Sequence, residues 1–504
     1  MTPYITYISN INSEELYDGL VGHGLFTSKI PQFITSENFL LYSKTPRYPK
    51  HSNERDYIRY SGMRNINVPR PLAIPDPFAY ANLCKFISTV WPQLTQHFRD
   101  KTSTELHKVS RIHIRKLFND EVLFEMNYKN FFMDGDPRQD IMIKSKYIAH
   151  ADIANCFPSI YSHSISWALV TKQYAKVNRT ATLWFNQIDT FTRNLKFGET
   201  NGLLIGPHVS NLISEIILTT VDYELVNKGF KYIRNIDDYT CYAKNHEEAE
   251  SFILSLSDEL KKYELTLNSK KTKILPLPTA NVKNWVTKLN HFNFVNTYEG
   301  RNGQIGIRVK ELKGFFDFAV ELMLDEGGDA SVINYAVQII AGKFLGVGAK
   351  KYLIKQMHHL VLLYPYLINI LDEHVFEPHS IDISEILMIA KDIYDYGVRC
   401  KIYEPCSFAI YWGLKYNFDL QIASIKDDSI LANDCIFLLL AYRIDLKYQR
   451  RIYLQEYKDH AKTLNNTDFQ QYWLFIYEVL TLNDLTNEFK HMKRQRITFI
   501  KPGF

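Results

Sequence analysis

The sequence has few cysteines, little net charge and no long hydrophobic run. Its six cysteines form no C-x-x-C pair, the spacing typical of zinc sites and redox motifs, so we expect reduced thiols in the core. The longest apolar stretch, around residues 360–371, is interrupted by Pro365 and is too short to span a bilayer. The first residues show no basic segment followed by an apolar one, as a secretory signal would need. These absences favour a soluble cytoplasmic protein that makes no contact with a membrane.

Charged and apolar residues are present in ordinary globular proportions. Lys and Arg number 59 and Asp and Glu 55, which leaves a net charge of +4. A surplus this small does not by itself indicate a nucleic-acid-binding protein, because such proteins can confine their basic residues to one groove. Hydrophobic residues make up 46% and charged residues 23% of the chain, a balance that excludes wholesale disorder. A length of 504 residues predicts more than one domain.

The pattern of apolar residues changes at about residue 312. We expect an α+β domain over residues 1–312 and a domain of irregular helical repeats over residues 313–504. Alternation predicts a strand from Arg111 to Tyr128 and a β-rich run from Ile141 to Asp152, whereas the proline-rich stretch from Val68 to Pro77 predicts an irregular loop. The elements predicted after these are helices at 207–226 and 247–263 and strands at 232–242 and 265–267.

Three aspartates stand where predicted strands end. Asp152 closes the run that begins at Ile141, and Asp237 and Asp238 lie between two short strands. If a neighbouring strand brings Asp152 beside Asp237, the set can hold two Mg²⁺ ions, or Mn²⁺ in their place, because hard cations prefer oxygen ligands. Such a metal pair activates an attacking oxygen in nucleotidyl transfer. Adjacent aspartates are also common in turns that have no function, and spacing alone favours that interpretation.

Four short segments, in order along the chain, favour a function for these aspartates over a turn without function. The segments are 152–157 (DIANCF), 202–210 (GLLIGPHVS), 235–238 (NIDD) and 268–272 (NSKKT). Together they resemble the palm motifs of reverse transcriptases: an aspartate with an aromatic five residues later, a glycine-containing segment, paired aspartates and a basic turn. The segment 159–168 (SIYSHSISWA) and the Ile-Gly-Pro form of the second motif resemble the bacterial abortive-infection (Abi) polymerases, phage-defence relatives of reverse transcriptases that include prophage-encoded members.

The resemblance implies a reverse-transcriptase-like fingers and palm domain followed by an all-helical, HEAT-like C-terminal domain. The site residues that it implies are Asp152, Ile153 and Asp237 for the metals, Asp238 as a further catalytic carboxylate, and Phe157 as steric gate with Gly206 and Lys271 for the nucleotide.

As activity, the resemblance implies Mg²⁺-dependent polymerisation of dNTPs, without a template and primed by the protein itself. The product would be single-stranded DNA attached covalently to the chain, and the protein would be a homo-oligomer, a trimer or hexamer, with an antiphage role. Ile205 and Asn235 stand where template-copying reverse transcriptases usually have Gln and an aromatic residue, which speaks against ordinary copying. Two other hypotheses stay open: conventional RNA-templated synthesis, and a non-catalytic helical-repeat scaffold.

A group of basic residues precedes the first motif. Arg111 and Arg115, with Lys108 and Lys116 near them, have the charge and hydrogen-bonding geometry to bind a nucleoside triphosphate from a fingers strand. A solvated basic strand face explains the same residues equally well.

Tyrosine hydroxyls are the predicted primers, because a phenol forms its anion at lower cost than an alcohol. The chain has 33 tyrosines. We expect those near the N-terminus to lie in mobile segments that can reach the site. These candidates are Tyr4, Tyr7, Tyr17, Tyr42 and Tyr48.

Overall fold

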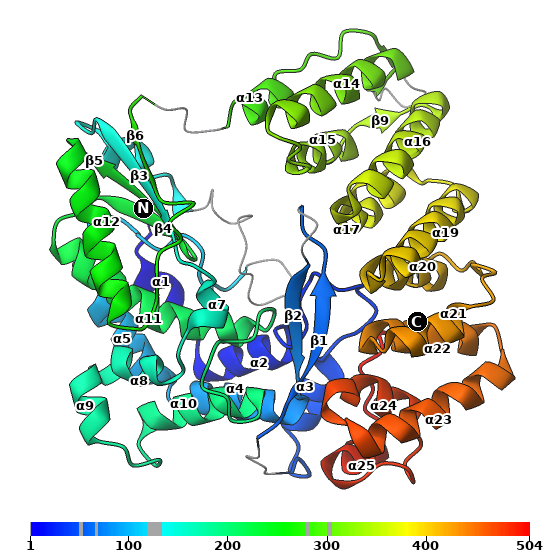
Figure 1. The fold of residues 1–504 in the computed structure, drawn as a ribbon, viewed down its shortest axis with the longest axis horizontal. Coiled ribbons are helices and arrows are strands. Elements are labelled where there is room, and N and C mark those ends of the chain that lie inside the picture. The colour runs from blue at the N-terminus through cyan, green and yellow to red at the C-terminus, as the bar shows by residue number, and fades with distance from the viewer. Residues whose placement is uncertain (1, 50–53, 66–68, 118–133, 279–282, 300–304) are drawn as a thin grey trace.

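A four-stranded antiparallel sheet forms the centre of the first half of the chain. In the computed structural model, which describes residues 2–49, 54–65, 69–117, 134–278, 283–299 and 305–504, its strands follow the order β4–β5–β3–β6 (Figure 1). Their bounds are β3 (Tyr147–Asp152), β4 (Tyr232–Asn235), β5 (Asp238–Ala243) and β6 (Lys273–Pro276).

The two faces of this sheet have different neighbours. On β3, Ala149 and Ala151 are buried on the side that packs against helix α12 (His246–Lys261), where small side chains allow a close approach. His150 and Asp152 alternate with them and therefore lie on the opposite face. The helix α11 (His208–Asn227) packs against α12 and is buried around most of its circumference. The helices thus cover one face and leave Asp152 on the other.

A second, two-stranded unit is the hairpin of β1 (Tyr57–Gly62) and β2 (Arg70–Pro75). The irregular loop predicted for residues 68–77 is wrong from residue 70 onward. Prolines fit here because β2 pairs with β1 alone in its sheet, and an edge strand tolerates missing N–H groups. Asp76 then caps helix α4 (Pro77–Thr89), accepting hydrogen bonds from the amides of Phe78 (2.9 Å) and Ala79 (3.0 Å).

The other helices of this half surround the sheet and the hairpin. They are α1 (Tyr4–Ser9), α2 (Ser13–His23), α3 (Glu37–Ser43), α5 (Trp91–Thr102), α6 (Arg138–Met142), α7 (Cys156–Ser159), α8 (His163–Val170), α9 (Lys172–Val177), α10 (Trp184–Arg193) and the 3₁₀ turn η2 (Asn194–Lys196). The structure confirms the predicted helices at 207–226 and 247–263 as α11 and α12, and the strands at 232–242 as β4 and β5.

Three predicted strands differ from the structure. Within residues 111–117 there is no strand, and the rest of the predicted strand to Tyr128 lies outside the described residues. The run from Ile141 is β-structure only from Tyr147, because α6 occupies its start. The predicted strand at 265–267 is reduced to one bridge between Leu267 and Ile153. In the described residues, alternation thus predicts longer strands than the backbone pairing forms.

The second half of the chain forms, in its described residues, helices and one small sheet. Its helices are α13 (Asn284–Asn290), α14 (Val309–Asp325), α15 (Ser331–Ala341), α16 (Val347–Leu363), η3 (Pro365–Leu367), α17 (Ile368–Leu371), η4 (Asp372–Phe376), α18 (Glu377–His379), α19 (Ile383–Cys400), α20 (Tyr403–Lys415), α21 (Ile425–Ala432), α22 (Cys435–Lys447), α23 (Arg451–Thr467), η5 (Gln470–Tyr472), α24 (Trp473–Val479) and α25 (Asn487–Arg494). The sheet contains β7 (Thr297–Glu299), β8 (Ile305–Ile307) and β9 (Phe344–Leu345). The boundary predicted between residues 312 and 313 falls inside α14.

The two halves share one hydrophobic core. The C-terminal residues return to the N-terminal helices, where Thr35 donates to the carbonyl of Phe499 (2.7 Å) and Lys501 to that of Phe33 (2.8 Å). Figure 1 shows the helices of the second half curving from the end of the four-stranded sheet back to α3. Buried apolar residues of both halves form a single connected cluster. Over the described residues, no helix combines the length and the apolar composition that spanning a bilayer demands.

Candidate active site

Three carboxylates meet at one end of the four-stranded sheet. The antiparallel register of β3 and β5 sets Asp152 opposite Asp238, and the turn before β5 carries Asp237. The amide of Ile153 donates to the carbonyl of Asp237 (3.2 Å), which ties the end of β3 to this turn. The structure therefore brings Asp152 next to the adjacent pair Asp237 and Asp238, from which it is distant in the sequence.

The basic turn after α12 contacts the first of these aspartates. Asn268 donates from its amide nitrogen to Asp152 Oδ1 (3.0 Å), and Lys271 Nζ lies 2.8 Å from Asp152 Oδ2. The main chain follows the same path, since the Asn268 N–H donates to the carbonyl of Asp152 (2.7 Å). Asp152, with 6% of its surface exposed, thus has a hydrogen-bond partner at each carboxylate oxygen.

Mutual repulsion and burial alter the titration of the other two acids. Burial, and then the charge of Asp152, raises the pKa of Asp237, while Lys271 and Arg70 act in the opposite direction. Desolvation raises the pKa of Asp238 to about 6, aided by its hydrogen bond with Asp152 and by the charge of Asp237. Neighbouring carboxylates that oppose each other's ionisation favour a bound cation, because its charge offsets their repulsion.

The loop after Asp152 is held against the glycine-containing segment. Phe157 lies in the one-turn helix α7 and is half-buried. Its carbonyl accepts from the amide of Leu203 (2.7 Å), and the carbonyl of Ile160 accepts from the amide of Gly202 (2.8 Å). The segments 152–160 and 202–203 therefore form one backbone unit next to the aspartates.

A pocket of 420 Å³ lies beside the carboxylates on the open face of the sheet. Exposed lysines flank it, so two acids and several cations share one surface. This mixture of charges suits a ligand that carries both phosphates and a metal ion. The lining residues are His150, Ala151, Asp152, Asp238, Tyr239, Thr240, Lys270, Lys271 and Lys273.

Comparison with known proteins identifies this region. Residues 83–294 match the family described as reverse transcriptase (RNA-dependent DNA polymerase). The chain therefore contains a reverse transcriptase domain. The matched stretch includes all three aspartates, the loop with Phe157 and the basic turn with Asn268 and Lys271.

Solved structures similar to the chain include two fungal telomerases. One is apo telomerase from Candida tropicalis truncated from its C-terminal domain, with 14% identity, 47% of this chain and 52% of that chain covered, and a TM-score of 0.29. The other is telomerase from Candida albicans in complex with a TWJ fragment of telomeric RNA, with 11% identity, 82% and 64% covered, and a TM-score of 0.33. The chain spans about half of the first and about two thirds of the second. No curated protein sequence matches it.

The aspartates of the reverse transcriptase domain fit a hard divalent cation. Across the described ranges, no three His, Cys, Asp or Glu side chains are already grouped as a metal-binding set. Mg²⁺ does not need one, because it takes one or two carboxylates and completes its shell with waters and substrate phosphates. Asp152 and Asp237 provide these oxygens. Asn235, opposite Asp238 in the pairing of β4 and β5, has a buried Oδ1 without a hydrogen-bond partner. Ile153 adjoins the set through its bond to Asp237.

The β1–β2 hairpin reaches the same region of the reverse transcriptase domain. The amide of Ala73 donates to the carbonyl of Ile205 (2.9 Å), and Gly206 follows at φ +129°, with the Ala73 carbonyl 3.1 Å from where its Cβ would lie. Arg70 begins β2 and lies within electrostatic range of Asp237. Gly206 thus allows the close contact of loop and hairpin, and Arg70 adds a cation that the sequence analysis missed.

Arg111 and Arg115 are not placed on an open strand face. Both are buried, with 1% and 5% of their surface exposed. Arg115 binds Asp134 through both nitrogens of its fork (2.8 and 3.0 Å), and Lys108 forms an ion pair with the same carboxylate. Burial therefore contradicts the solvated basic strand face, since Arg115 pairs with Asp134 and Arg111 donates to the carbonyl of Gly135 inside the fold. The contact of these side chains with a triphosphate stays a prediction.

The N-terminal tyrosines are packed rather than mobile. Tyr4, Tyr17 and Tyr42 lie in helices and are buried. The hydroxyls of Tyr4 and Tyr17 donate to Glu215 and Ser43, and that of Tyr42 shares a hydrogen bond with Nδ1 of His491. Burial raises the pKa of Tyr17 and of Tyr42 to about 12, which makes their phenolate costlier to form.

The two remaining candidates are half-buried. The ring of Tyr7 lies under Lys108 and Arg115, and Tyr48 stacks on Phe78. The mobile segments expected around all five tyrosines are therefore absent from the described residues 2–49.

Gly202 provides a test of how the loop unit is built. It adopts φ +78°, and the carbonyl oxygen of Pro158 lies 2.7 Å from where a Cβ would stand. We expect Gly202→Ala to destabilise the protein by about 1–3 kcal/mol through backbone strain alone, with the contact adding to this. The measurement is the midpoint of thermal unfolding.

Gly229→Ala is the matched control for this variant. Gly229 also has a positive φ, +86°, but no atom lies within 4 Å of the position that a Cβ would take, so it reports the strain without the contact. A Gly202→Ala midpoint at or above that of Gly229→Ala would contradict the close packing of the two segments.

Proposed function

We propose that the chain is a DNA polymerase that joins dNTPs at Asp152, Asp237 and Asp238. The observation that carries this proposal is the meeting of the three carboxylates at the ends of β3 and β5 inside a reverse transcriptase domain. Asp152 and Asp237 would hold Mg²⁺ or Mn²⁺, and Asp238 would assist. When bound, these ions supply Lewis-acid stabilisation of the attacking and leaving oxygens.

The neighbouring residues would orient the nucleotide. Lys271 lies against Asp152 and is 63% exposed at its side chain, so it can turn from that carboxylate to a substrate phosphate. Phe157 would lie beside the sugar and exclude a 2′-hydroxyl. Gly206 would keep the β1–β2 hairpin close, which places Arg70 near Asp237.

We further propose synthesis without a template, primed by a tyrosine of the chain, in an abortive-infection defence against phage. Support comes from Ile205 and Asn235, which replace the residues expected to grip a template and a primer end. The helical half adds support, since the amide of Ala330 donates to Asn65 Oδ1 (2.9 Å) beyond the end of β1. Helices in contact with that hairpin would help to enclose a product. The same proposal includes assembly of the chain into homo-oligomers, a HEAT-like fold of the helical half and a cytoplasmic location.

A second candidate function is RNA-templated DNA synthesis from a separate primer. The description of the matched family, RNA-dependent DNA polymerase, favours it. The two candidates share the carboxylates and differ in what supplies the 3′ end, so one experiment can separate them.

Removal of a carboxylate tests the catalytic assignment. We expect Asp152→Asn and Asp237→Asn each to lower dNTP incorporation about a hundredfold or more, because a lost metal ligand removes several kcal/mol of stabilisation. The measurement is incorporation of labelled dNTPs by purified protein with Mg²⁺. Asp258→Asn, at a side chain that is 69% exposed on α12, is the control and should keep full activity. Near-normal incorporation by either site variant would refute the assignment.

Sugar selection tests Phe157. We expect Phe157→Ala to raise the kcat/KM for ribonucleotides relative to deoxyribonucleotides by about tenfold or more, since shape exclusion is lost. Phe197→Ala, at an aromatic that is 63% exposed, should leave the ratio unchanged. If both variants keep the wild-type ratio, Phe157 is not the gate.

Self-priming predicts a covalent product. After expression, intact-protein mass spectrometry should show a ladder of nucleotide masses on the wild-type chain and none on Asp237→Asn, because the metals must act on a tyrosine oxygen. Peptide mapping should place the ladder on one tyrosine. The outcome that would establish the templated alternative is an unmodified active chain that incorporates label only with an annealed primer and template.

A further inference from the structure

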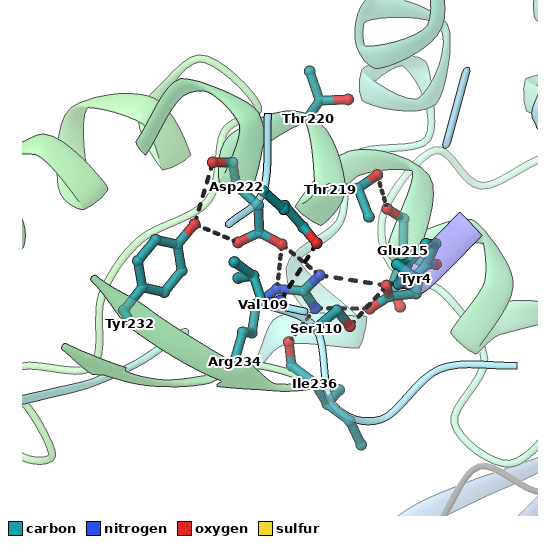
Figure 2. A network of polar contacts seen from close by, with 12 residues as sticks. Tyr4, Val109, Ser110, Glu215, Thr219, Thr220, Asp222, Tyr232, Arg234 and Ile236 are labelled. Carbon is teal, nitrogen blue, oxygen red and sulfur yellow. Dashed lines mark hydrogen bonds and ion pairs between the residues drawn. The ribbon is translucent and has the colours of Figure 1, made fainter. Parts of the chain in front are cut away.

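Arg234 occupies the strand that leads into the catalytic turn. It lies in β4 with 0% of its surface exposed, on the face of the sheet that α11 covers. Its own backbone is fixed on both sides, since its amide donates to the carbonyl of Val109 (2.9 Å) and its carbonyl accepts from Arg111 (2.8 Å). Figure 2 shows the guanidinium at the centre of a cluster of polar side chains, with Asp222 and Glu215 on one side and Ile236 of the turn on the other.

Two carboxylates of α11 anchor the guanidinium. Nε donates to Asp222 Oδ2 (2.8 Å), and Nη1 donates to Glu215 Oε1 (2.7 Å). These acids are themselves held, because Tyr232 donates to Asp222 (3.0 Å) and Ser110 to Glu215 (3.0 Å). Because each carboxylate accepts hydrogen bonds from several donors, the cluster holds the guanidinium in one orientation.

The remaining contact of Arg234 is with the catalytic turn itself. Nη1 donates to the carbonyl oxygen of Ile236 (2.9 Å). Ile236 has φ +59°, a left-handed conformation that a β-branched side chain strongly disfavours. Its carbonyl belongs to the peptide unit that begins Asp237, so the hydrogen bond fixes the plane from which the Asp237 side chain departs.

We propose that Arg234 is a positioning residue that holds the strained Ile236–Asp237 peptide and thereby keeps the Asp237 carboxylate in place beside Asp152. The role rests on the proposed metal-binding function of that carboxylate. Arginine suits this role because its planar guanidinium donates hydrogen bonds in several fixed directions at once. A lysine ammonium cannot donate to Asp222, Glu215 and the Ile236 carbonyl together.

The other members of the cluster do not share this role. Ser110, Tyr232 and the two acids contact the guanidinium or one another, and in the described residues the side-chain bond to the Ile236 carbonyl comes from Arg234. A purely structural function would be affected by loss of any of them. A positioning function acts through the residue that contacts the turn, and the two acids influence it only by orienting Arg234.

Binding of Mn²⁺ alone to the full-length protein, followed by electron paramagnetic resonance, tests the proposal without requiring any polymerase activity. We expect Arg234→Lys to raise the dissociation constant for Mn²⁺ at the aspartates by about tenfold or more, the usual effect of losing a residue that orients a metal ligand. Ser214→Ala, at a buried serine of α11 that donates to the carbonyl of Asn211 and not to the cluster, is the control and should bind Mn²⁺ as the wild type does. The part of the bound Mn²⁺ signal that is lost in Asp237→Asn is the part that belongs to this site.

A rescue variant separates positioning from loss of stability. Glycine adopts a positive φ without strain, so Ile236→Gly in the Arg234→Lys background should recover most of the Mn²⁺ affinity. Should Arg234→Lys fail to fold, Glu215→Gln gives the same test, since it keeps the arginine and weakens its anchor, and it should raise the dissociation constant in the same direction.

The possible results are distinct. Wild-type affinity in Arg234→Lys, or in Glu215→Gln where that variant replaces it, overturns the positioning role, as does a double variant that binds no better than Arg234→Lys. If Asp237→Asn binds Mn²⁺ as well as the wild type, the metal site of the proposed function fails, and the positioning role fails with it. If Mn²⁺ binding behaves as expected but no dNTP is incorporated, the proposed polymerase function fails while the role of Arg234 stands.

Discussion

Strands β3 and β5 pair in the register that sets Asp152 opposite Asp238, and the site depends on this alignment. Side chains alternate between the faces of a strand, so a slip of one residue would turn Asp152 toward α12 and His150 with it. The register is strongly specified because Ala149 and Ala151 fit beneath α12, where larger or charged side chains would not. The packing of α12 on one face of the sheet thus determines which side chains lie on the other face, at the candidate site.

Two groups of acids lie on opposite sides of the same strands, and their hydrogen bonding differs. Beneath the sheet, Asp222 and Glu215 share the guanidinium of Arg234 and accept further hydrogen bonds from hydroxyls. Above it, Asp237 and Asp238 have raised pKa values because burial and like charge oppose their ionisation. A saturated cluster stabilises one arrangement of the chain, whereas an undersaturated one retains affinity for a ligand. The first group therefore stabilises the fold, and the second forms the candidate site.

The helical half is joined to the first half at widely separated places. The segment 499–501 pairs with residues 33–35, and Glu404 of α20 accepts from the amide of Met63 beyond the end of β1. Burial raises the pKa of Glu404 to about 8, so this contact is made by a carboxyl removed from water. Because the β1–β2 hairpin carries Arg70 toward Asp237 and also contacts the helices, it links the helical half to the carboxylates.

The sequence by itself determined the elements and residues whose signals are local. Helices α11 and α12 follow from apolar periodicity, and the aspartates at 152, 237 and 238 follow from strand ends and from the motif order that the family match supports. The contacts of Arg234 and Asn268 depend on the tertiary structure, because their partners come from other elements; Asn268 and Asp152 are 116 residues apart. The tertiary structure also contradicts two interpretations made from local sequence patterns. Arg111 and Arg115 alternate like a surface strand, yet both are buried, and Arg115 pairs with Asp134 in the interior. Tyr4 and Tyr17 stand near a terminus, yet helices pack over them. Periodicity records which side of an element is apolar, whereas burial of a charge or a hydroxyl depends on a partner that only the folded chain brings within hydrogen-bond distance.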